Sequence, residues 1–433
     1  MRNHTAALVL VGSLLNLTPV VAPALAQLSS ASPGVTFTDG SPTVFATHAQ
    51  FVSYGYHWGP SDGTFGAIPA AGNSYTFYGT AGSSATCSAS GTITEGAYTF
   101  TGTLDRVTGS VCRKLFGPGD GPGWLFDKDY AGGGQLVRFT GNGTSGWLMP
   151  FHAEMQWKNM QNPPSYSCDG VPCFYASLGL AVSTDDGKTF RVAGQVFQPS
   201  QPLSVFEGGG KNMPAGYGSL IVADANGKHL ENPPPDPSIA YFYLFITDLY
   251  PGLPGACGNF NCIGVERAAY TDVISAVLSG DPHRVAKVFH KYSGASANPW
   301  SAAATSDTQD NSGTAGTYAP LWTDEPAYGA SVLYDSAFDV YLIVYPAKDG
   351  AKIRASTDLI HWSEPIGPTI SNPGFTMMYP ILIGETGDPN TGGASPRLYY
   401  SAFVGTSFPD WSQSTFETVQ ITLFRPRRRP SKP

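Results

Sequence analysis

The sequence predicts an all-β protein, and three features of its composition agree on this class. Only 13% of the 433 residues are charged, whereas an average soluble domain has about 25%. Aromatic residues are frequent, with 22 Tyr, 24 Phe and 8 Trp, and the 51 Gly and 36 Pro together make up a fifth of the chain. Many short strands joined by turns have this composition. Coiled coils, charged helical bundles and disordered chains do not, so these classes are excluded.

The first 26 residues have the pattern of a secretory signal peptide. Residues 1–4 are weakly basic, residues 6–17 are largely apolar, and Ala24-Leu25-Ala26 provides the small residues of a cleavage site. An N-terminal helix buried in the fold is the alternative. We therefore expect a protein secreted to the periplasm or the extracellular space, with a mature chain that begins at Gln27. The apolar run is too short to span a bilayer, and no later run qualifies as a membrane helix.

Charge is unevenly distributed along the chain. The Pro-rich segment 425–433 carries five of the 24 Lys and Arg residues and no acid, although the net charge of the whole chain is −8. We interpret this segment as a solvated tail, with anchoring to a surface as the alternative. Residues 27–424 then form one domain that is strongly acidic. Such a domain repels polyphosphates, so nucleic acid is not an expected partner.

Six cysteines suit an oxidising compartment. Two pairs are each separated by five positions and lie in loops rich in Pro and Gly, so each pair is expected to close a small ring. The remaining two cysteines would pair with each other. The predicted disulfides are Cys168–Cys173, Cys257–Cys262 and Cys87–Cys112. A zinc site is not predicted, because no Cys-x-x-Cys pair and no neighbouring His pair occurs.

An internal repeat predicts the architecture. Ala181-Val-Ser-Thr-Asp185, Ala268-Ala-Tyr-Thr-Asp272 and Arg354-Ala-Ser-Thr-Asp358 each lead through small residues to Thr-Asp, and their aspartates are 87 and 86 residues apart. Self-similarity at a constant period signals an array of like supersecondary units. A β-sandwich, the alternative architecture, offers no reason for this spacing.

Each unit repeats the same order of strands. An aromatic-rich strand precedes each Thr-Asp, another strand precedes that one, and a further strand such as 191–197 follows the turn. The predicted first strands are 135–139, 219–222, 330–334 and 379–383, and the predicted second strands are 146–154, 241–248, 340–345 and 397–403. Four antiparallel strands repeated around an axis make a β-propeller. With one more blade from residues 35–120, we expect five blades of four strands, with six blades as the alternative.

Two of the Thr-Asp turns resemble motifs of known propellers. Ser183-Thr-Asp185-Asp-Gly187-Lys-Thr189-Phe190 resembles the Asp-box of sialidases and other propellers. Ser356-Thr-Asp358-Leu359-Ile-His-Trp362 is similar to a turn common in five-bladed propeller glycosidases of the arabinanase and invertase-like families. The resemblance rests on these motifs and on the blade rhythm over residues 120–424. It implies a glycoside hydrolase that acts on a polysaccharide or oligosaccharide, with a furanose-containing or other neutral polymer as the expected substrate.

The aspartates of these turns are expected to be structural. A carboxylate in a hairpin turn accepts backbone N–H bonds, and a glycine such as Gly187 adopts positive φ there. Because strands alternate in direction, the Asp185 and Asp358 turns lie on the face opposite to the starts of the first strands. Propeller enzymes that this chain resembles use the central depression where the inner strands begin. Site residues should therefore precede a first strand or end a second strand.

Few acids meet this condition in a chain with so little charge. They are Asp127, Asp129, Glu154, Glu207, Asp248, Asp324 and Glu325. A glycosidase needs two carboxyl groups that flank the scissile bond, and a third acid nearby raises the pKa of the proton donor. We predict Asp129 as base or nucleophile and Glu154 as acid, with Asp127 and Asp324 as further catalytic candidates. Asp127 and Asp129 would share one face of an extended segment.

Aromatic and polar residues near these acids are candidates for substrate binding. Those expected to stack on sugar rings or to bind hydroxyl groups are Trp124, Trp322, Tyr328, His152, Lys211 and Glu325. No metal ligand is predicted at the site and no cofactor is required, although the acid excess would suit a structural Ca²⁺ in the central channel. We expect a monomer. The competing hypotheses are a sialidase, which needs an arginine cluster, and a non-catalytic propeller that binds glycans or a surface partner.

Overall fold

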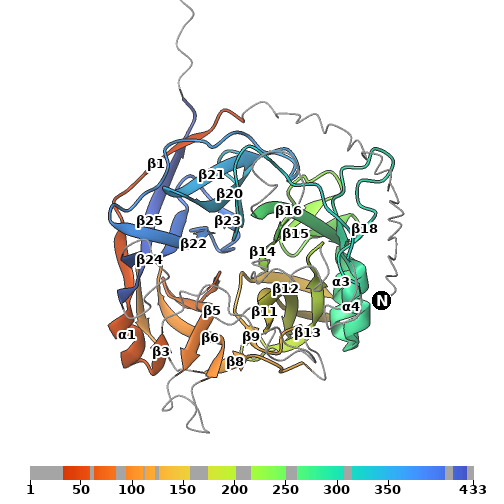
Figure 1. The fold of residues 1–433 in the computed structure, drawn as a ribbon, viewed down its shortest axis with the longest axis horizontal. Helices are drawn as coiled ribbons and strands as arrows, with labels where there is room; N and C mark the ends of the chain where they lie inside the picture. Colours follow the sequence, from red (N-terminus) through yellow and green to blue (C-terminus); the bar gives the residue numbers. More distant parts are fainter. Residues whose placement is uncertain are drawn as a thin grey trace, which may run out of the picture.

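The computed structural model describes residues 33–426 apart from nine internal segments. These segments are 59–62, 84–93, 111–112, 122–125, 157–173, 201–215, 250–260, 307–314 and 405–412. Within the described residues, five small sheets stand in a ring around a common axis (Figure 1). We number them blades I to V in chain order, starting from residue 56. The prediction of a five-bladed β-propeller is confirmed.

The first three blades are formed by residues 56–303. Blade I contains β3 (Tyr56–Trp58), β4 (Gly66–Pro69), β5 (Tyr75–Ser83), β6 (Thr94–Thr103), β7 (Arg106–Gly109) and β8 (Lys114–Phe116). Blade II contains β9 (Tyr130–Ala131), β10 (Val137–Gly141), β11 (Thr144–Gln156), β12 (Phe174–Ser183) and β13 (Arg191–Phe197). Blade III contains β14 (Gly216–Asp224), β15 (Ala240–Leu249), β16 (Asn261–Ala269), β17 (His290–Lys291) and β18 (Ala302–Ala303). In blade II the strand order β10-β11-β12-β13 is the predicted one.

The remaining two blades complete the ring. Blade IV contains β19 (Ser331–Asp335), β20 (Val340–Ala347) and β21 (Gly350–Ser356), and β23 (Thr391–Gly392) pairs in parallel with β19. Blade V contains β22 (Phe375–Ile383), β24 (Arg397–Val404), β25 (Thr415–Phe424), β1 (Thr36–Asp39) and β2 (Thr43–Thr47). The short helix α1 (His48–Ser53) leads from β2 to blade I. Inner strands of neighbouring blades face one another around the axis.

The two ends of the propeller meet in one blade. β1 and β2 pair antiparallel with β25, with Thr36 opposite Phe424 and Thr43 opposite Thr418. Residues 36–47 therefore belong to blade V, and only residues 56–116 form blade I. The prediction that residues 35–120 form a single blade was correct for the later part of this region alone. Such pairing between the first and last strands closes the ring and covers the outer edge of β25.

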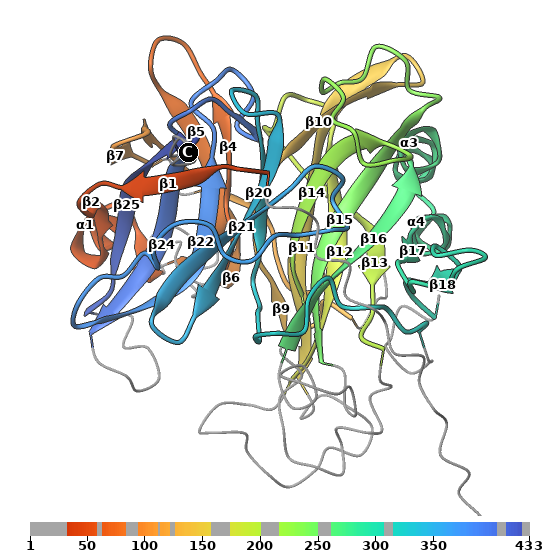
Figure 2. The same cartoon turned by 90° about the horizontal axis from the view of Figure 1, so that it is seen from above.

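Blade III departs from the predicted strand–turn–strand pattern. After β16 the chain forms α3 (Tyr270–Ser279) and α4 (Pro282–Val288), which lie on the outside of the ring (Figure 2). The turn predicted after Asp272 was therefore wrong, whereas the strand predicted to follow it is present as β17, which pairs antiparallel with β16. Apolar residues at helical spacing explain the difference, because Tyr270, Val273, Ile274 and Val277 of α3 are all buried.

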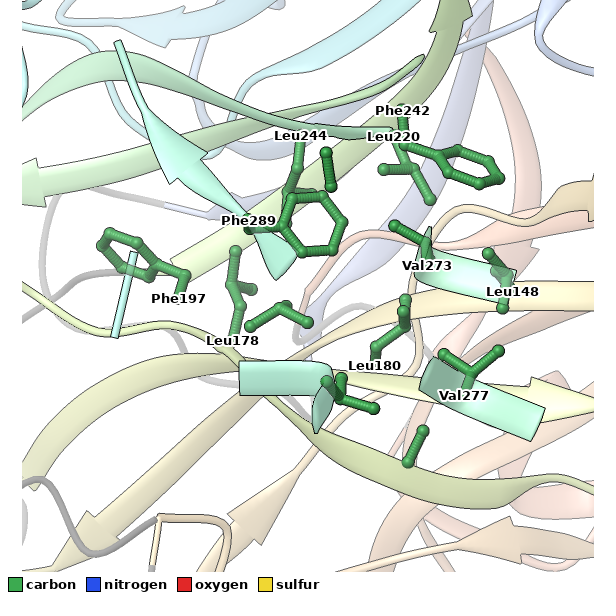
Figure 3. Close-up of a cluster of buried hydrophobic side chains, with 14 of the residues drawn as sticks. Leu148, Leu178, Leu180, Phe197, Leu220, Phe242, Leu244, Val273, Val277 and Phe289 are labelled. Carbon is green, nitrogen blue, oxygen red and sulfur yellow. The ribbon is translucent and has the colours of Figure 1, made fainter. Parts of the chain in front are cut away.

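The largest apolar cluster joins blade II to blade III. Leu148 of β11 and Leu180 of β12 belong to the same buried cluster as Leu244 of β15, and Val273 and Val277 of α3 complete it (Figure 3). Each such side chain contributes about 1.5–3 kcal/mol when it is fully buried. This packing holds β11 firmly against β14, and these two strands carry side chains of the candidate site described below.

The two motif aspartates bond within their own turns. Asp185 accepts hydrogen bonds from the Thr189 backbone N–H (2.9 Å) and hydroxyl (2.6 Å). Desolvation opposes them, but these bonds and one from Ser183 lower the pKa of Asp185 to about 2. Asp358 accepts from the backbone N–H groups of the two following turn residues, 360 and 361. These contacts are the ones that the structural interpretation requires.

Several predictions concern residues that the structure does not describe. Segments 1–32 and 427–433 lie outside the described residues, and so do all cysteines except Cys262. The signal peptide, the basic tail and the three disulfide pairings therefore stay predictions. Among the helices that the structure describes, none combines the length and the apolar character needed to cross a bilayer.

Candidate active site

The start of the inner strand of blade II lies beside the end of its second strand. Tyr130 of β9 pairs with Glu154 of β11, and the Asp129 backbone N–H donates to the Glu154 carbonyl oxygen (3.0 Å). The Gly132 N–H likewise donates to the His152 carbonyl oxygen (2.9 Å). The structure thus brings Asp129, His152 and Glu154 to one end of one blade. Their chemical roles stay predictions.

A run of glycines makes this arrangement possible. A Cβ atom on Gly134 would lie 1.9 Å from the Pro150 carbonyl oxygen, and one on Gly133 would lie 2.8 Å from the carbonyl carbon of Gly79. Residues 132–134 therefore pass between β5 of blade I and β11 of blade II, where no side chain fits. This close approach explains a Gly-Gly-Gly sequence that has no phosphate-binding context.

His152 holds the carboxylate of Glu154. The Nε2 atom of His152 lies 3.0 Å from Glu154 Oε1, and the two side chains are 4% and 14% exposed. The Nδ1 atom of His152 is buried without a hydrogen-bond partner among the described residues. It faces the backbone of Gly216, where an added Cβ would lie 2.3 Å away. A proton on Nδ1 would have no acceptor there, so Nε2 is the nitrogen that donates its hydrogen to Glu154.

Aromatic rings surround the histidine. Tyr130 meets the His152 ring edge-on, with 5.4 Å between centroids, and Tyr217 of β14 stacks on it in parallel at 4.4 Å. Tyr217 in turn contacts Tyr379 of β22, with 5.2 Å between ring centroids. Sequence reasoning missed Tyr217 and Tyr379. Nothing in the local pattern distinguishes them from the other 20 tyrosines of the chain.

A polar network centred on Gln135 joins the inner strands of neighbouring blades near the axis. Gln135 Oε1 accepts from the Ser219 hydroxyl (2.7 Å) and the Leu220 N–H (2.8 Å), while Gln135 Nε2 donates to the Val332 carbonyl (3.2 Å) and to Asn390 Oδ1 (2.5 Å). Blades II, III and IV thus meet through one side chain. Gln135 Oε1 is thus already engaged by two donors, and the structural Ca²⁺ that the acid excess would suit stays a prediction. No group of three His, Cys, Asp or Glu suited to a metal occurs in the described part of the chain.

Asp127 differs from Asp129 in its surroundings. Residues 126–129 form turns and bends, so the two aspartates do not share a face of an extended segment as predicted. Asp127 is fully buried, and neither carboxylate oxygen has a hydrogen-bond partner among the described residues. Desolvation raises its pKa to about 7. Asp129 is half-buried.

The acids that precede β19 are held by basic residues of blade IV. Arg354 of β21 lies 2.5 Å from Asp324 and 2.8 Å from Glu325, and Lys352 lies 2.7 Å from Glu325. Tyr345 also donates a hydrogen bond to Glu325. Burial acts in the opposite direction, but these contacts lower the pKa of Glu325. Asp324 and Glu325 are therefore parts of an ion-pair network that is separate from the described contacts of Asp129 and Glu154.

Other predicted binding residues occupy varied positions. Trp322 is only 2% exposed, and its ring packs under the Arg354 guanidinium at 4.8 Å, so it does not offer a face for stacking on a sugar. Tyr328 is half-buried and precedes Gly329, which faces Tyr217. Asp248 lies inside blade III, where it accepts from Ser200. Trp124, Lys211 and Glu207 lie outside the described residues.

Comparison with known proteins finds similarity in fold. No model of a known protein family and no curated protein matches the chain. The catalytic domain of a Coprinopsis cinerea GH62 α-L-arabinofuranosidase is similar over 91% of this chain and 98% of its own, with 9% identity and a TM-score of 0.45. A family 117 glycoside hydrolase of the marine bacterium Zobellia galactanivorans is similar over 90% of this chain and 92% of its own, with 10% identity and a TM-score of 0.48. A GH43 endo-arabinanase of Bacillus licheniformis is similar over 84% and 95%, with 10% identity and a TM-score of 0.40.

Proposed function

We propose that this protein is a secreted glycoside hydrolase that cleaves a furanose-containing or other neutral polysaccharide or oligosaccharide with the carboxyl groups of Asp129 and Glu154. The observation that carries the proposal is the 3.0 Å backbone hydrogen bond from Asp129 to Glu154. It joins the start of the inner strand to the end of the second strand of blade II. Two carboxyl groups at one edge of one blade are the minimum that hydrolysis of a glycosidic bond needs.

The surroundings of Glu154 suit a proton donor. His152 occupies Glu154 Oε1, so Oε2 is the oxygen that would carry the proton to the glycosidic oxygen. The Glu154 side chain is only 14% exposed, which limits its contact with water. Asp129 would activate water or attack the sugar from the opposite side of the scissile bond. His152 acts in this proposal by holding Glu154 and not by binding a sugar hydroxyl.

The contrast with blade IV supports this choice of acids. Asp324 and Glu325 face the buried Arg354, so their negative charge is already compensated. The described contacts of Glu154 include no Lys or Arg. A carboxyl group free of a permanent cation can exchange a proton during a reaction cycle, whereas one bound to a guanidinium stays ionised.

Hydrolysis of a panel of arabinans, fructans and sialosides tests the proposal. Wild type should release reducing sugar from at least one polymer. Glu154→Gln and Asp129→Asn should each lower the rate by about 10²–10⁴-fold, with an unchanged circular dichroism spectrum. Asp324→Asn is the matched control and should lower the rate by less than about tenfold, since this is below the range expected for loss of an acid or base.

The same panel separates the enzyme from the non-catalytic alternative. A propeller that only binds glycans or a surface partner would retain a glycan on the panel in both blade II variants and would hydrolyse none of them. That combination of results would replace the proposed activity with a binding function. Activity that survives both blade II substitutions would show that other residues carry the reaction.

A further inference from the structure

Two tyrosines adopt a backbone conformation that is rare for their residue type. Tyr217 has φ 57° and Tyr379 has φ 53°. Of the other non-glycine residues with positive φ in the described chain, Asn142, Asp186 and Asp339 are Asn or Asp residues in hairpin turns, and Leu359 (φ 69°) lies in the turn directly after Asp358. Asn and Asp tolerate this region of φ. Tyr217 and Tyr379 instead lie within strands β14 and β22. A bulky residue held there is strained, and such strain persists only where the surrounding structure enforces it.

The same irregularity occurs at both positions. Pairing of β14 with β15 breaks between Gly216 and Ser219, and pairing of β22 with β24 breaks between Met378 and Ile381. Each tyrosine directly follows the last paired residue before the break, Tyr217 after Gly216 and Tyr379 after Met378. A bulge re-aims a side chain relative to the regular alternation of a strand. Both bulges lie on inner strands, in blades III and V.

The bulges bring the two rings together. Blades III and V are separated by blade IV, so residues of their inner strands meet only near the axis. The two hydroxyl groups are 3.4 Å apart and the ring centroids 5.2 Å apart. Tyr217 also stacks on His152 with only 3° between the ring planes. A continuous row of side chains therefore runs from Glu154 through His152 and Tyr217 to Tyr379.

We propose that Tyr217 and Tyr379 are positioning residues of the blade II site. Tyr217 fixes the plane of the His152 ring, and Tyr379 fixes Tyr217 from the opposite side of the axis. With its ring held and Nδ1 pressed against Gly216, His152 keeps its Nε2–H on Glu154. The inference rests on the proposed function for its catalytic meaning, but the positioning of His152 can be measured without a substrate.

Exchange to glycine isolates the ring from the backbone. Glycine adopts a φ of about 57° without strain, so Tyr217→Gly removes the ring and relieves the backbone together. We expect a melting temperature equal to or above that of wild type.

The tautomer of His152 can be measured in proteins labelled with ¹⁵N-histidine, where the His152 ring signals are identified by their loss in His152→Gln. These signals should show the Nε2–H tautomer in wild type and in Tyr217→Phe. In Tyr217→Gly they should show a mixture of tautomers. Tyr379→Gly should produce a smaller change of the same kind.

Two controls keep the result interpretable. Asn142→Gly also introduces a glycine at a positive φ, here 51°, in the turn between β10 and β11. This variant should leave the His152 signals unchanged. If Tyr217→Gly does not fold, Tyr217→Asn serves instead, because Asn tolerates this region of φ. Unchanged His152 signals in the folded glycine or asparagine variant would overturn the inference.

Kinetics then separate this inference from the proposed function. On a glycan that wild type hydrolyses, Tyr217→Gly should lower kcat at least tenfold with little change in KM, and it should move the pH dependence of kcat. An equal kcat and pH profile would contradict a positioning role. If wild type hydrolyses nothing, the proposed function fails, while the histidine signals still decide whether the tyrosines position His152.

Discussion

Blade II and blade IV each present a pair of acids before their first strand or at the end of their second, yet the two pairs have opposite surroundings. In blade IV, Arg354 and Lys352 contact Asp324 and Glu325 at 2.5–2.8 Å. In blade II, the side chain that contacts the Glu154 carboxylate among the described residues is the imidazole of His152. The position of an acid within the blade therefore does not decide whether a cation compensates its charge. The charged side chains on the neighbouring strand decide it.

The difference in surroundings between the two acid pairs can be traced to one position of the Thr-Asp repeat. Arg354 occupies the place in its Thr-Asp motif that Ala181 and Ala268 occupy in the other two. Its side chain is 1% exposed, and a buried guanidinium needs anions close by. The chain before β19 does not run directly to the axis, because Leu321 bonds to Ile263 of blade III on its way. This path places Asp324 and Glu325 where they neutralise Arg354.

The largest expected effect comes from exchanging one glutamate in each blade. Glu154→Gln should lower the hydrolytic rate by about 10²–10⁴-fold, because it removes the proton donor, and should leave the melting temperature near that of wild type. Glu325→Gln should do the reverse, with a rate within about tenfold of wild type and a lower melting temperature. Initial rates and thermal melts of both variants measure this. Equal losses of activity would abolish the distinction between the blades.

A second experiment measures what Arg354 contributes to stability. Arg354→Met should lower the free energy of unfolding by about 3–5 kcal/mol at pH 7, because it leaves two acids without their buried partner. The native pKa of Glu325 is lowered from 4.5. The stability from this contact is therefore present above about pH 4.5 and is lost as the pH falls through the native pKa. Urea denaturation at pH 7 and pH 3 should show a smaller difference at pH 3.

The matched control for this experiment is Arg106→Met. Arg106 is an exposed residue of β7, so its exchange should change the free energy of unfolding by less than about 0.5 kcal/mol. A loss at Arg354 that is as small as the control, or one that is equal at both pH values, would show that the ion pairs do not stabilise blade IV.

Asp127 extends the comparison to an acid that is buried with no cation among its described contacts. Its native pKa is raised from 3.8 to about 7 by desolvation. Its contribution to stability is therefore present below about pH 4 and is lost as the pH rises through about 7. Asp127→Asn, which cannot ionise, should reduce the loss of stability between pH 4 and pH 8 by at most about 4 kcal/mol. Denaturation curves over this range measure it, and an identical pH dependence in wild type and variant would contradict the burial of an ionisable carboxyl group.

Much of the fold could be predicted because it depends on local patterns. The 87- and 86-residue spacing of the Thr-Asp motifs and the strand rhythm indicated five blades, and the structure has them. The juxtaposition of Asp129 and Glu154 also followed, since Asp129 directly precedes β9 and Glu154 lies in β11 of the same blade. The helices α3 and α4 were missed because the Thr-Asp repeat suggested a turn, while the apolar spacing of residues 270–277 favoured a helix.

The sequence by itself determined the fold class, favoured five blades over six and indicated the blade that carries the candidate acids. These features arise from contacts between residues that are close along the chain. Only the tertiary structure decided that β1 closes blade V with β25, that Arg354 neutralises Asp324 and Glu325, and that Tyr217 meets Tyr379 across the axis. Tyr217 and Tyr379 are 162 residues apart. No local pattern records a contact of that range, because it exists only after the ring of blades has closed around the axis.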